Sequence, residues 1–129
     1  MRPRVAFGAD EMNIRFSRGH VVAQSLFWAA MVFTLFVALL PPQPGSSLLP
    51  DKVQHAIAFC VLGLLGSYAY PRLSWVWLIA GLSLFGGLIE LAQGTSFIHR
   101  DRDPLDWLTD TIACAAIVLA LRWWARPKR

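Results

Sequence analysis

The stretch WVWLIAGLSLFGGLIELAQ, residues 75–93, decides the fold, because its first fifteen residues carry no charge. A helix needs about 20 mostly apolar residues to cross the hydrocarbon core of a bilayer. Three further apolar stretches of similar length lie at residues 21–40, 53–70 and 105–124. Only 16% of the 129 residues are charged, whereas about 25% is usual in soluble domains. The sequence therefore predicts an all-α integral membrane protein, a four-transmembrane-helix bundle that forms one domain over residues 1–129.

The first apolar stretch follows Arg15 and Arg18, as the hydrophobic region of a signal peptide would. It is longer than the roughly 7–15 apolar residues of such a region, and prolines follow it instead of a small-residue cleavage site. We therefore expect a retained membrane anchor. Met12 is an alternative start of the chain.

Basic residues are distributed unevenly among the segments that connect the predicted spans. Nine of the twelve lie on one side, namely Arg2, Arg4, Arg15, Arg18, Arg72, Arg122, Arg126, Lys128 and Arg129. Lys52, Arg100 and Arg102 lie on the other side, together with most of the acidic residues. Because basic loops stay in the cytoplasm, both termini are predicted to be cytoplasmic. This segregation accounts for the net charge of +4, and we expect no nucleic acid as a partner.

Polar side chains are concentrated near the outer ends of three predicted spans. They are Asp51, Lys52 and His55 in the second span, Glu90 and Gln93 in the third, and Asp106 and Asp110 in the fourth. Ionisable groups at membrane depth cost a few kcal/mol each. Spacings of three or four residues place the members of each group on one helix face. We expect one polar site on the extracytoplasmic side, with Arg100 and Arg102 of the adjoining loop at its rim.

Residue chemistry indicates what this site does. The candidates for acid–base catalysis, or for a buried polar network, are His55, Glu90, Asp106 and Asp110. The candidates for substrate binding are Asp51, Lys52, Gln93, Arg100 and Arg102. Histidine and carboxylates also bind divalent cations, but no ligand-spacing motif is present, so we expect neither a metal nor another cofactor. The residues leave open whether the chain is an enzyme.

Smaller features of the spans have structural interpretations. Asp51 and Asp106 each have a role as a helix cap as the alternative to a role in the site. Asp103, followed by Pro104, fits the start of the last helix. Cys60 and Cys114 are expected to be small apolar packing groups. Small residues that allow helices to approach closely recur at Gly63, Gly66, Gly81, Gly86, Gly87, Ala116 and Ala120.

Two motifs resemble those of the VanZ-like family of small bacterial membrane proteins. One is the run Asp51-Lys52-Val53-Gln54-His55, followed by Phe59. The other is Ile89-Glu90-Leu91-Ala92-Gln93, then an arginine (Arg100 or Arg102), then Asp106-Trp107-Leu108-Thr109-Asp110. The resemblance covers about residues 40–121. The chain departs from the family at Asp110, where members often carry Asn, and near Ala113, where Gly is common.

The resemblance implies a protein of the bacterial cytoplasmic (inner) membrane with a role in the cell envelope. The family is named for a member associated with low-level resistance to the glycopeptide teicoplanin. We expect the site to bind, or in an enzymatic version to process, an anionic lipid headgroup or a lipid-linked wall precursor. The alternative is a non-catalytic structural or interaction subunit of an envelope complex, and a homo-oligomer or an envelope-protein partner stays open.

Overall fold

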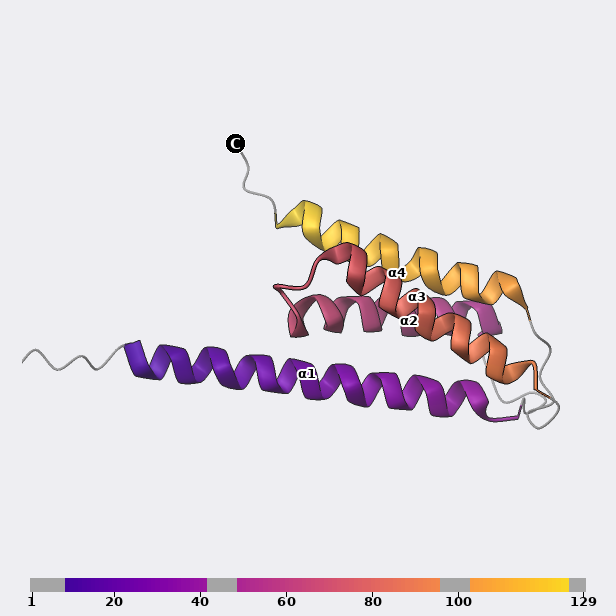
Figure 1. The fold of residues 1–129 in the computed structure, drawn as a ribbon, viewed down its shortest axis with the longest axis horizontal. Helices are drawn as coiled ribbons and strands as arrows, with labels where there is room; N and C mark the ends of the chain where they lie inside the picture. Colours follow the sequence, from indigo (N-terminus) through magenta and orange to yellow (C-terminus); the bar gives the residue numbers. More distant parts are fainter. Residues whose placement is uncertain (1–8, 42–48, 96–102, 126–129) are drawn as a thin grey trace, which may run out of the picture.

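The computed structural model shows four helices in the part of the chain that it describes (Figure 1). The structure describes residues 9–41, 49–95 and 103–125, with side chains from residue 18 onward. The helices are α1 (Ala9–Leu39), α2 (Asp51–Ala69), α3 (Trp75–Gln93) and α4 (Pro104–Trp124). The described residues include no strand, so the all-α prediction is confirmed.

Three of the four helices are long and apolar enough to cross a membrane: residues Arg18–Leu39 of α1, and all of α3 and α4. The prediction of a fourth span, at residues 53–70, is not confirmed by this criterion. The reason is composition, since α2 begins with the polar residues Asp51, Lys52, Gln54 and His55. Helix α2 also contacts all three other helices, and its Phe59 and Leu62 are completely buried. A helix with one face buried against protein needs less apolar surface than one that faces lipid on all sides.

The predicted element boundaries agree with the structure except at the start of α1. This helix begins at Ala9, twelve residues before the predicted span at residue 21. The additional residues are too polar to belong to an apolar stretch, but they include no proline that would interrupt a helix. Helices α2 and α3 are joined by the short predicted turn at residues 70–74 and pack against each other.

Local capping fixes where α4 begins. Asp103 is the N-cap residue, and its Oδ1 atom accepts a hydrogen bond from the backbone N–H of Leu105 at 2.9 Å. Pro104 occupies the first turn, where the missing N–H costs nothing. The predicted cap at Asp103 is confirmed. The N-cap residue of α2 is Pro50, so the alternative of Asp51 as an N-cap is wrong, and Asp51 lies in the first turn.

Close approach of α2 and α4 depends on Gly63. A Cβ atom at this position would lie 2.7 Å from Cγ2 of Ile117 and 3.2 Å from the carbonyl oxygen of Cys114. By contrast, Gly81 meets nothing within 4 Å, and Ala116 and Ala120 are exposed. The prediction of close helix contact therefore holds at Gly63 but is wrong for these three residues, which lie on outward faces.

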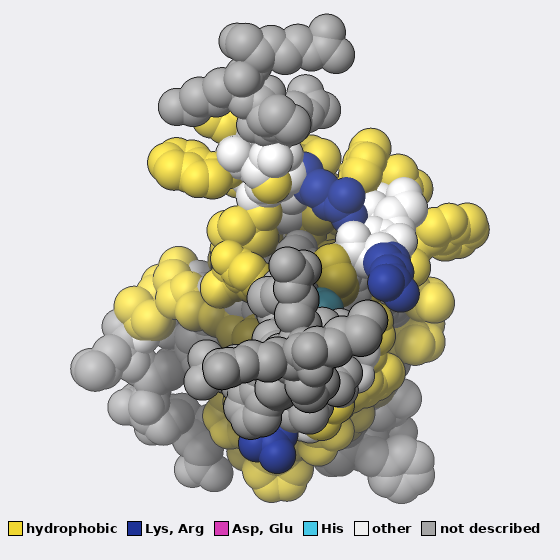
Figure 2. Space-filling view, turned by 90° about the vertical axis from the view of Figure 1, so that its left-hand side faces the viewer, with side chains coloured by type: hydrophobic (Ala, Val, Ile, Leu, Met, Phe, Trp, Pro, Cys, Tyr) yellow, Lys and Arg dark blue, Asp and Glu magenta, His cyan; other side chains and the backbone are white. Residues whose placement is uncertain are grey.

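The two ends of the bundle differ in charge. Arg18, Arg72 and Arg122 lie towards the end where α2 joins α3, and Figure 2 looks onto this end. There, the Arg122 guanidinium donates a hydrogen bond to the carbonyl oxygen of Leu73 at 2.8 Å. Every acidic residue with a described side chain lies at the opposite end, where α2 and α4 begin and α3 ends. Between the two ends the surface is rich in exposed large hydrophobic side chains, which suits a lipid environment.

Candidate functional site

Polar side chains from three helices converge at the acidic end of the bundle. The starts of α2 and α4 lie there beside the end of α3, because successive helices run in opposite directions. His55, Glu90, Gln93, Asp106 and Asp110 are at most 9% exposed. Such burial is unusual for ionisable residues and occurs mainly where they are paired. The structure brings these five residues together at one end of the bundle.

The centre of the site is a contact between His55 and Asp110. The Nδ1 atom of His55 lies 3.2 Å from Oδ2 of Asp110, whose side chain is completely buried. The second oxygen of this carboxylate, Oδ1, has no hydrogen-bond partner among the described residues. The contact links α2 to α4 and holds the imidazole ring in one orientation.

The mouth of the site is formed by Lys52, which is about half exposed. Its ammonium group donates a hydrogen bond to Oδ1 of Asp106 at 2.7 Å and another to Asp103. These two hydrogen bonds raise the pKa of Lys52 above its usual value. The same ammonium, together with the N–H of Leu105, lowers the pKa of the Asp103 carboxyl.

Asp103 is the site residue that the sequence analysis missed, since it was assigned only as a helix cap. One of its carboxylate oxygens caps α4 and the other binds Lys52. Its backbone N–H also donates to Oε2 of Glu90 at 3.2 Å. The signal in the sequence was its position between the basic loop and α4, but the pairing with Lys52, fifty-one residues away, is a tertiary contact.

The other predicted site residues differ in what they contact. Glu90 is 5% exposed, and its Oε1 atom has no hydrogen-bond partner among the described residues. Gln93 donates from Nε2 to the carbonyl oxygen of Ala38 at 2.8 Å, so it joins α3 to the end of α1. Arg100 and Arg102 lie outside the described residues.

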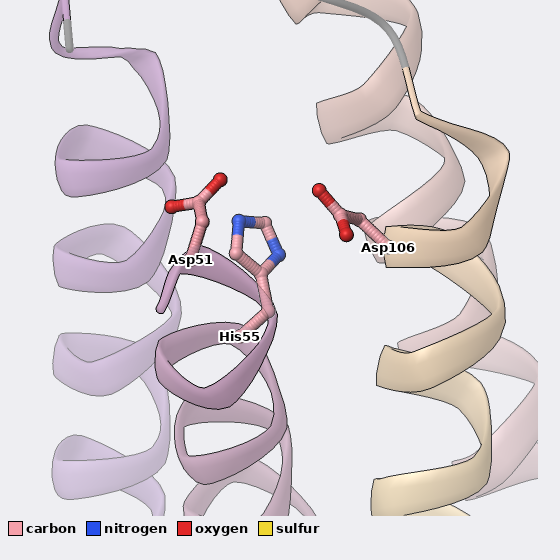
Figure 3. Close-up of side chains that lie close together, drawn as sticks. All are labelled: Asp51, His55 and Asp106. Atoms are coloured by element: carbon pink, nitrogen blue, oxygen red, sulfur yellow. The ribbon is translucent and has the colours of Figure 1, made fainter. Parts of the chain in front are cut away.

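Asp51, His55 and Asp106 form a compact group at the start of α2 and α4 (Figure 3). Each offers one carboxylate oxygen or ring nitrogen, and these atoms all lie within 4.8 Å of one another. Such a group can exchange protons or hold a cation.

An open apolar groove of about 430 Å³ lies beside this polar cluster. It is lined mainly by α2, with one residue of α4. The lining residues are Lys52, Val53, Ala56, Ile57, Cys60, Val61 and Thr109. Neither cysteine forms a disulfide, and Cys114 is completely buried, consistent with its expected packing role.

Together these features define an all-helical protein with three helices able to cross a membrane and a buried cluster of ionisable residues at one end. Comparison of the chain with protein-family models, with curated proteins and with solved structures finds no match. The resemblance to the VanZ-like family therefore stays a prediction from the two sequence motifs.

Proposed function

We propose that this chain is a VanZ-like multi-pass protein of the bacterial cytoplasmic membrane, with the polar site on the extracytoplasmic side and both termini in the cytoplasm. The distribution of charge supports this topology. Arg18, Arg72 and Arg122 lie towards one end, and the buried acidic residues lie at the other. Basic residues are retained on the cytoplasmic side. In this arrangement α2 is the fourth span, and it contacts the other three helices.

The proposed function is binding of an anionic lipid at the extracytoplasmic end. The observation that carries it is the groove along α2, which has an apolar lining and includes Lys52 among its lining residues. An acyl chain suits a wall formed by Val53, Ile57 and Val61. A phosphate group suits Lys52, which is exposed enough to be reached. This polarity matches a lipid whose headgroup lies at the membrane surface.

Lys52 already binds Asp103 and Asp106, so a phosphate must share the ammonium with two carboxylates. An ammonium group has three donors, and these contacts use two of them. The third donor remains for the lipid. We therefore expect the headgroup to approach Lys52 from the side of the groove that this residue lines.

Native mass spectrometry of the purified chain tests the proposal. Released from nanodiscs of phosphatidylglycerol and phosphatidylcholine in equal amounts, the chain should retain phosphatidylglycerol preferentially. Ile57→Trp fills the groove and should reduce this retention at least fivefold, and Lys52→Gln should abolish the preference for the anionic lipid. The matched control is Ile112→Trp, since Ile112 is similarly exposed but lies outside the groove. Equal retention by the wild type and Ile57→Trp would contradict the proposal.

The family resemblance extends the proposal to lipid-linked wall precursors and to glycopeptide resistance. In an enzymatic version, His55 and Glu90 act as the acid–base pair on a phosphate held by Lys52. Expression of the chain in a teicoplanin-sensitive bacterium should raise the inhibitory concentration of teicoplanin. His55→Gln and Glu90→Gln, checked for equal membrane abundance, should lose the effect. Unchanged resistance in both variants would show that the resistance does not depend on this site.

A structural role is the second candidate, and the interhelical polar contacts favour it. Trp107 donates from Nε1 to the carbonyl oxygen of Ser83 at 3.0 Å, and the Ser83 and Thr111 hydroxyls are 2.8 Å apart. Like the contact of Gln93 with Ala38, these bonds hold one helix against another. In this alternative, a variant would lose function only to the extent that it loses folded protein. Parallel measurements of resistance and thermal stability distinguish this role from lipid binding.

A further inference from the structure

We propose that Asp51, His55 and Asp106 form a binding site for a divalent transition-metal cation, with Asp110 positioning the histidine. The three residues come from two helices and offer one imidazole nitrogen and two carboxylate oxygens. These atoms lie within 4.8 Å of one another. The proposal goes beyond lipid binding and does not depend on it, because the cation can be bound and measured without a lipid.

The orientation of His55 is the first reason. Its Nδ1 atom faces Asp110 of α4, at 3.2 Å from Oδ2. In Figure 3 the other ring nitrogen, which is therefore Nε2, lies on the side of Asp51. Histidines that bind metals usually donate one ring N–H to a carboxylate, which fixes the tautomer and leaves the other nitrogen free to coordinate. His55 has this arrangement.

Two buried oxygen atoms without partners are the second and independent reason. Among the described residues, Oδ1 of Asp110 and Oε1 of Glu90 accept no hydrogen bond. Asp110 is completely buried and directly contacts His55. A buried carboxylate oxygen without a donor is costly. A cation, with the water molecules it coordinates, supplies the positive charge and the donors that these oxygens lack.

Charge balance points the same way. Asp51, Asp103, Asp106, Asp110 and Glu90 place five carboxylates at this end of the bundle. In the described part of the chain, which does not include Arg100 and Arg102, only Lys52 and, when protonated, His55 oppose them. Uncompensated charge is expensive near the membrane core. A divalent cation reduces the imbalance without removing any of the observed contacts.

The ligand set favours a first-row transition metal. An imidazole nitrogen suits Zn²⁺ and Mn²⁺ better than Mg²⁺ or Ca²⁺, which prefer oxygen ligands alone. Zn²⁺ bonds of about 2.0–2.2 Å require ligand atoms roughly 3.3 Å apart, so the group must contract on binding. Asp51 is exposed and lies in the first turn of α2. Water molecules complete the coordination.

Metal binding to the untagged, detergent-solubilised full chain tests the proposal. After removal of metals with a chelator, titration calorimetry with Zn²⁺ and with Mn²⁺ should show one site per chain, and Ca²⁺ should bind at least tenfold more weakly. His55→Asn and Asp51→Asn should each weaken Zn²⁺ binding at least tenfold. Asp110→Asn, which removes the carboxylate charge that raises the basicity of the coordinating imidazole, should weaken it about 10–100-fold.

The matched control is His20→Asn, because His20 lies on α1 towards the other end of the bundle. This variant should bind Zn²⁺ as the wild type does. Co²⁺ provides a readout of geometry, since its visible absorption spectrum should change in Asp51→Asn, a variant of an exposed residue that should fold normally. Equal Zn²⁺ affinity of the wild type and both His55→Asn and Asp51→Asn, or no binding by the wild type, would overturn the proposal.

Discussion

The imidazole of His55 and the carboxylate of Asp110 meet 3.2 Å apart, although fifty-five residues separate them in the chain. Asp110 is completely buried and His55 is 9% exposed. The contact fastens α2 to α4, the pair of helices with the most extensive packing in the described structure. It therefore serves both the stability of the bundle and the orientation of the only histidine at the described site.

Replacing Asp110 separates the effect of its charge from that of its hydrogen bond. Asp110→Ala removes the partner of His55 and leaves a cavity, so it should lower the free energy of unfolding by about 3 kcal/mol. Asp110→Asn keeps an acceptor for Nδ1 and removes an incompletely satisfied charge, so the loss should stay below about 1 kcal/mol. Unfolding in detergent, followed by tryptophan fluorescence, measures both. Equal destabilisation by the two variants would contradict this account.

Gly63 and Gly81 form a matched pair for testing helix packing. Gly63→Ala would place a Cβ atom 3.2 Å from the carbonyl oxygen of Cys114, a backbone atom that cannot move away cheaply. We expect a loss of about 1–3 kcal/mol from overpacking. Gly81→Ala meets nothing within 4 Å and should be neutral or stabilising by up to about 1 kcal/mol. Thermal unfolding of the two variants side by side checks the difference in sign.

Phe59 should be the most sensitive aromatic residue of the bundle. It is completely buried, and the centroid of its ring lies 6.1 Å from the centroid of the Phe85 ring. Phe59→Ala should cost about 3–5 kcal/mol, as core truncations of phenylalanine do. Phe33→Ala is the control, because Phe33 is 68% exposed on α1. A comparable loss in both variants would show that α1 is covered by a partner or a second copy.

The Lys52–Asp103 ion pair should make stability depend on pH. Because Lys52 lowers the pKa of folded Asp103, the pair contributes above pH about 4 and loses its contribution as the pH falls further. Because the pKa of Lys52 is raised, its contribution is present below pH about 10.5 and is lost only above that value. The stability difference between the wild type and Lys52→Met should therefore shrink from pH 7 to pH 3. It should also shrink in 0.5 M salt, since exposed pairs are screened.

Topology is testable with single cysteines in a Cys60→Ala, Cys114→Ala background. Leu49→Cys lies beside the start of α2, and Ala125→Cys follows the end of α4. A membrane-impermeant maleimide applied to intact cells of a bacterium lacking an outer-membrane barrier should label only Leu49→Cys. Labelling of Ala125→Cys alone would reverse the proposed orientation. Labelling of both from outside would mean that only two of α2, α3 and α4 cross the membrane, or none, and α2 is the one that fails the length and composition criterion.

Local sequence patterns predicted the helices well. Apolar runs of about 20 residues are enough to place the first and last residues of α2, α3 and α4 within one or two residues. Pro41 marks the end of α1, and the turn at residues 70–74 separates α2 from α3. Polar residues at one end of three such runs also indicated where the site lies. Both signals depend on residues close together in the chain, since helix periodicity and span length are local properties.

Other features required the tertiary structure. Gly63 and Gly81 look alike in the sequence, yet only Gly63 faces a neighbouring helix, because the rotation of each helix is set by packing. Asp103 looked like a cap, and its pairing with Lys52 appears only when α2 and α4 lie side by side. Gln93 lies near Glu90 in the sequence but contacts α1.

The sequence by itself determined that this chain forms long apolar helices with ionisable residues concentrated at one end. Only the tertiary structure decided which of those residues meet. It paired His55 with Asp110 and brought Asp51, His55 and Asp106 together. Among the described residues, it left one oxygen of Glu90 and one of Asp110 without hydrogen-bond partners. The physical reason is that hydropathy depends only on the residues of a single helix. Contacts between side chains of different helices depend on how neighbouring helices are rotated and how closely they approach.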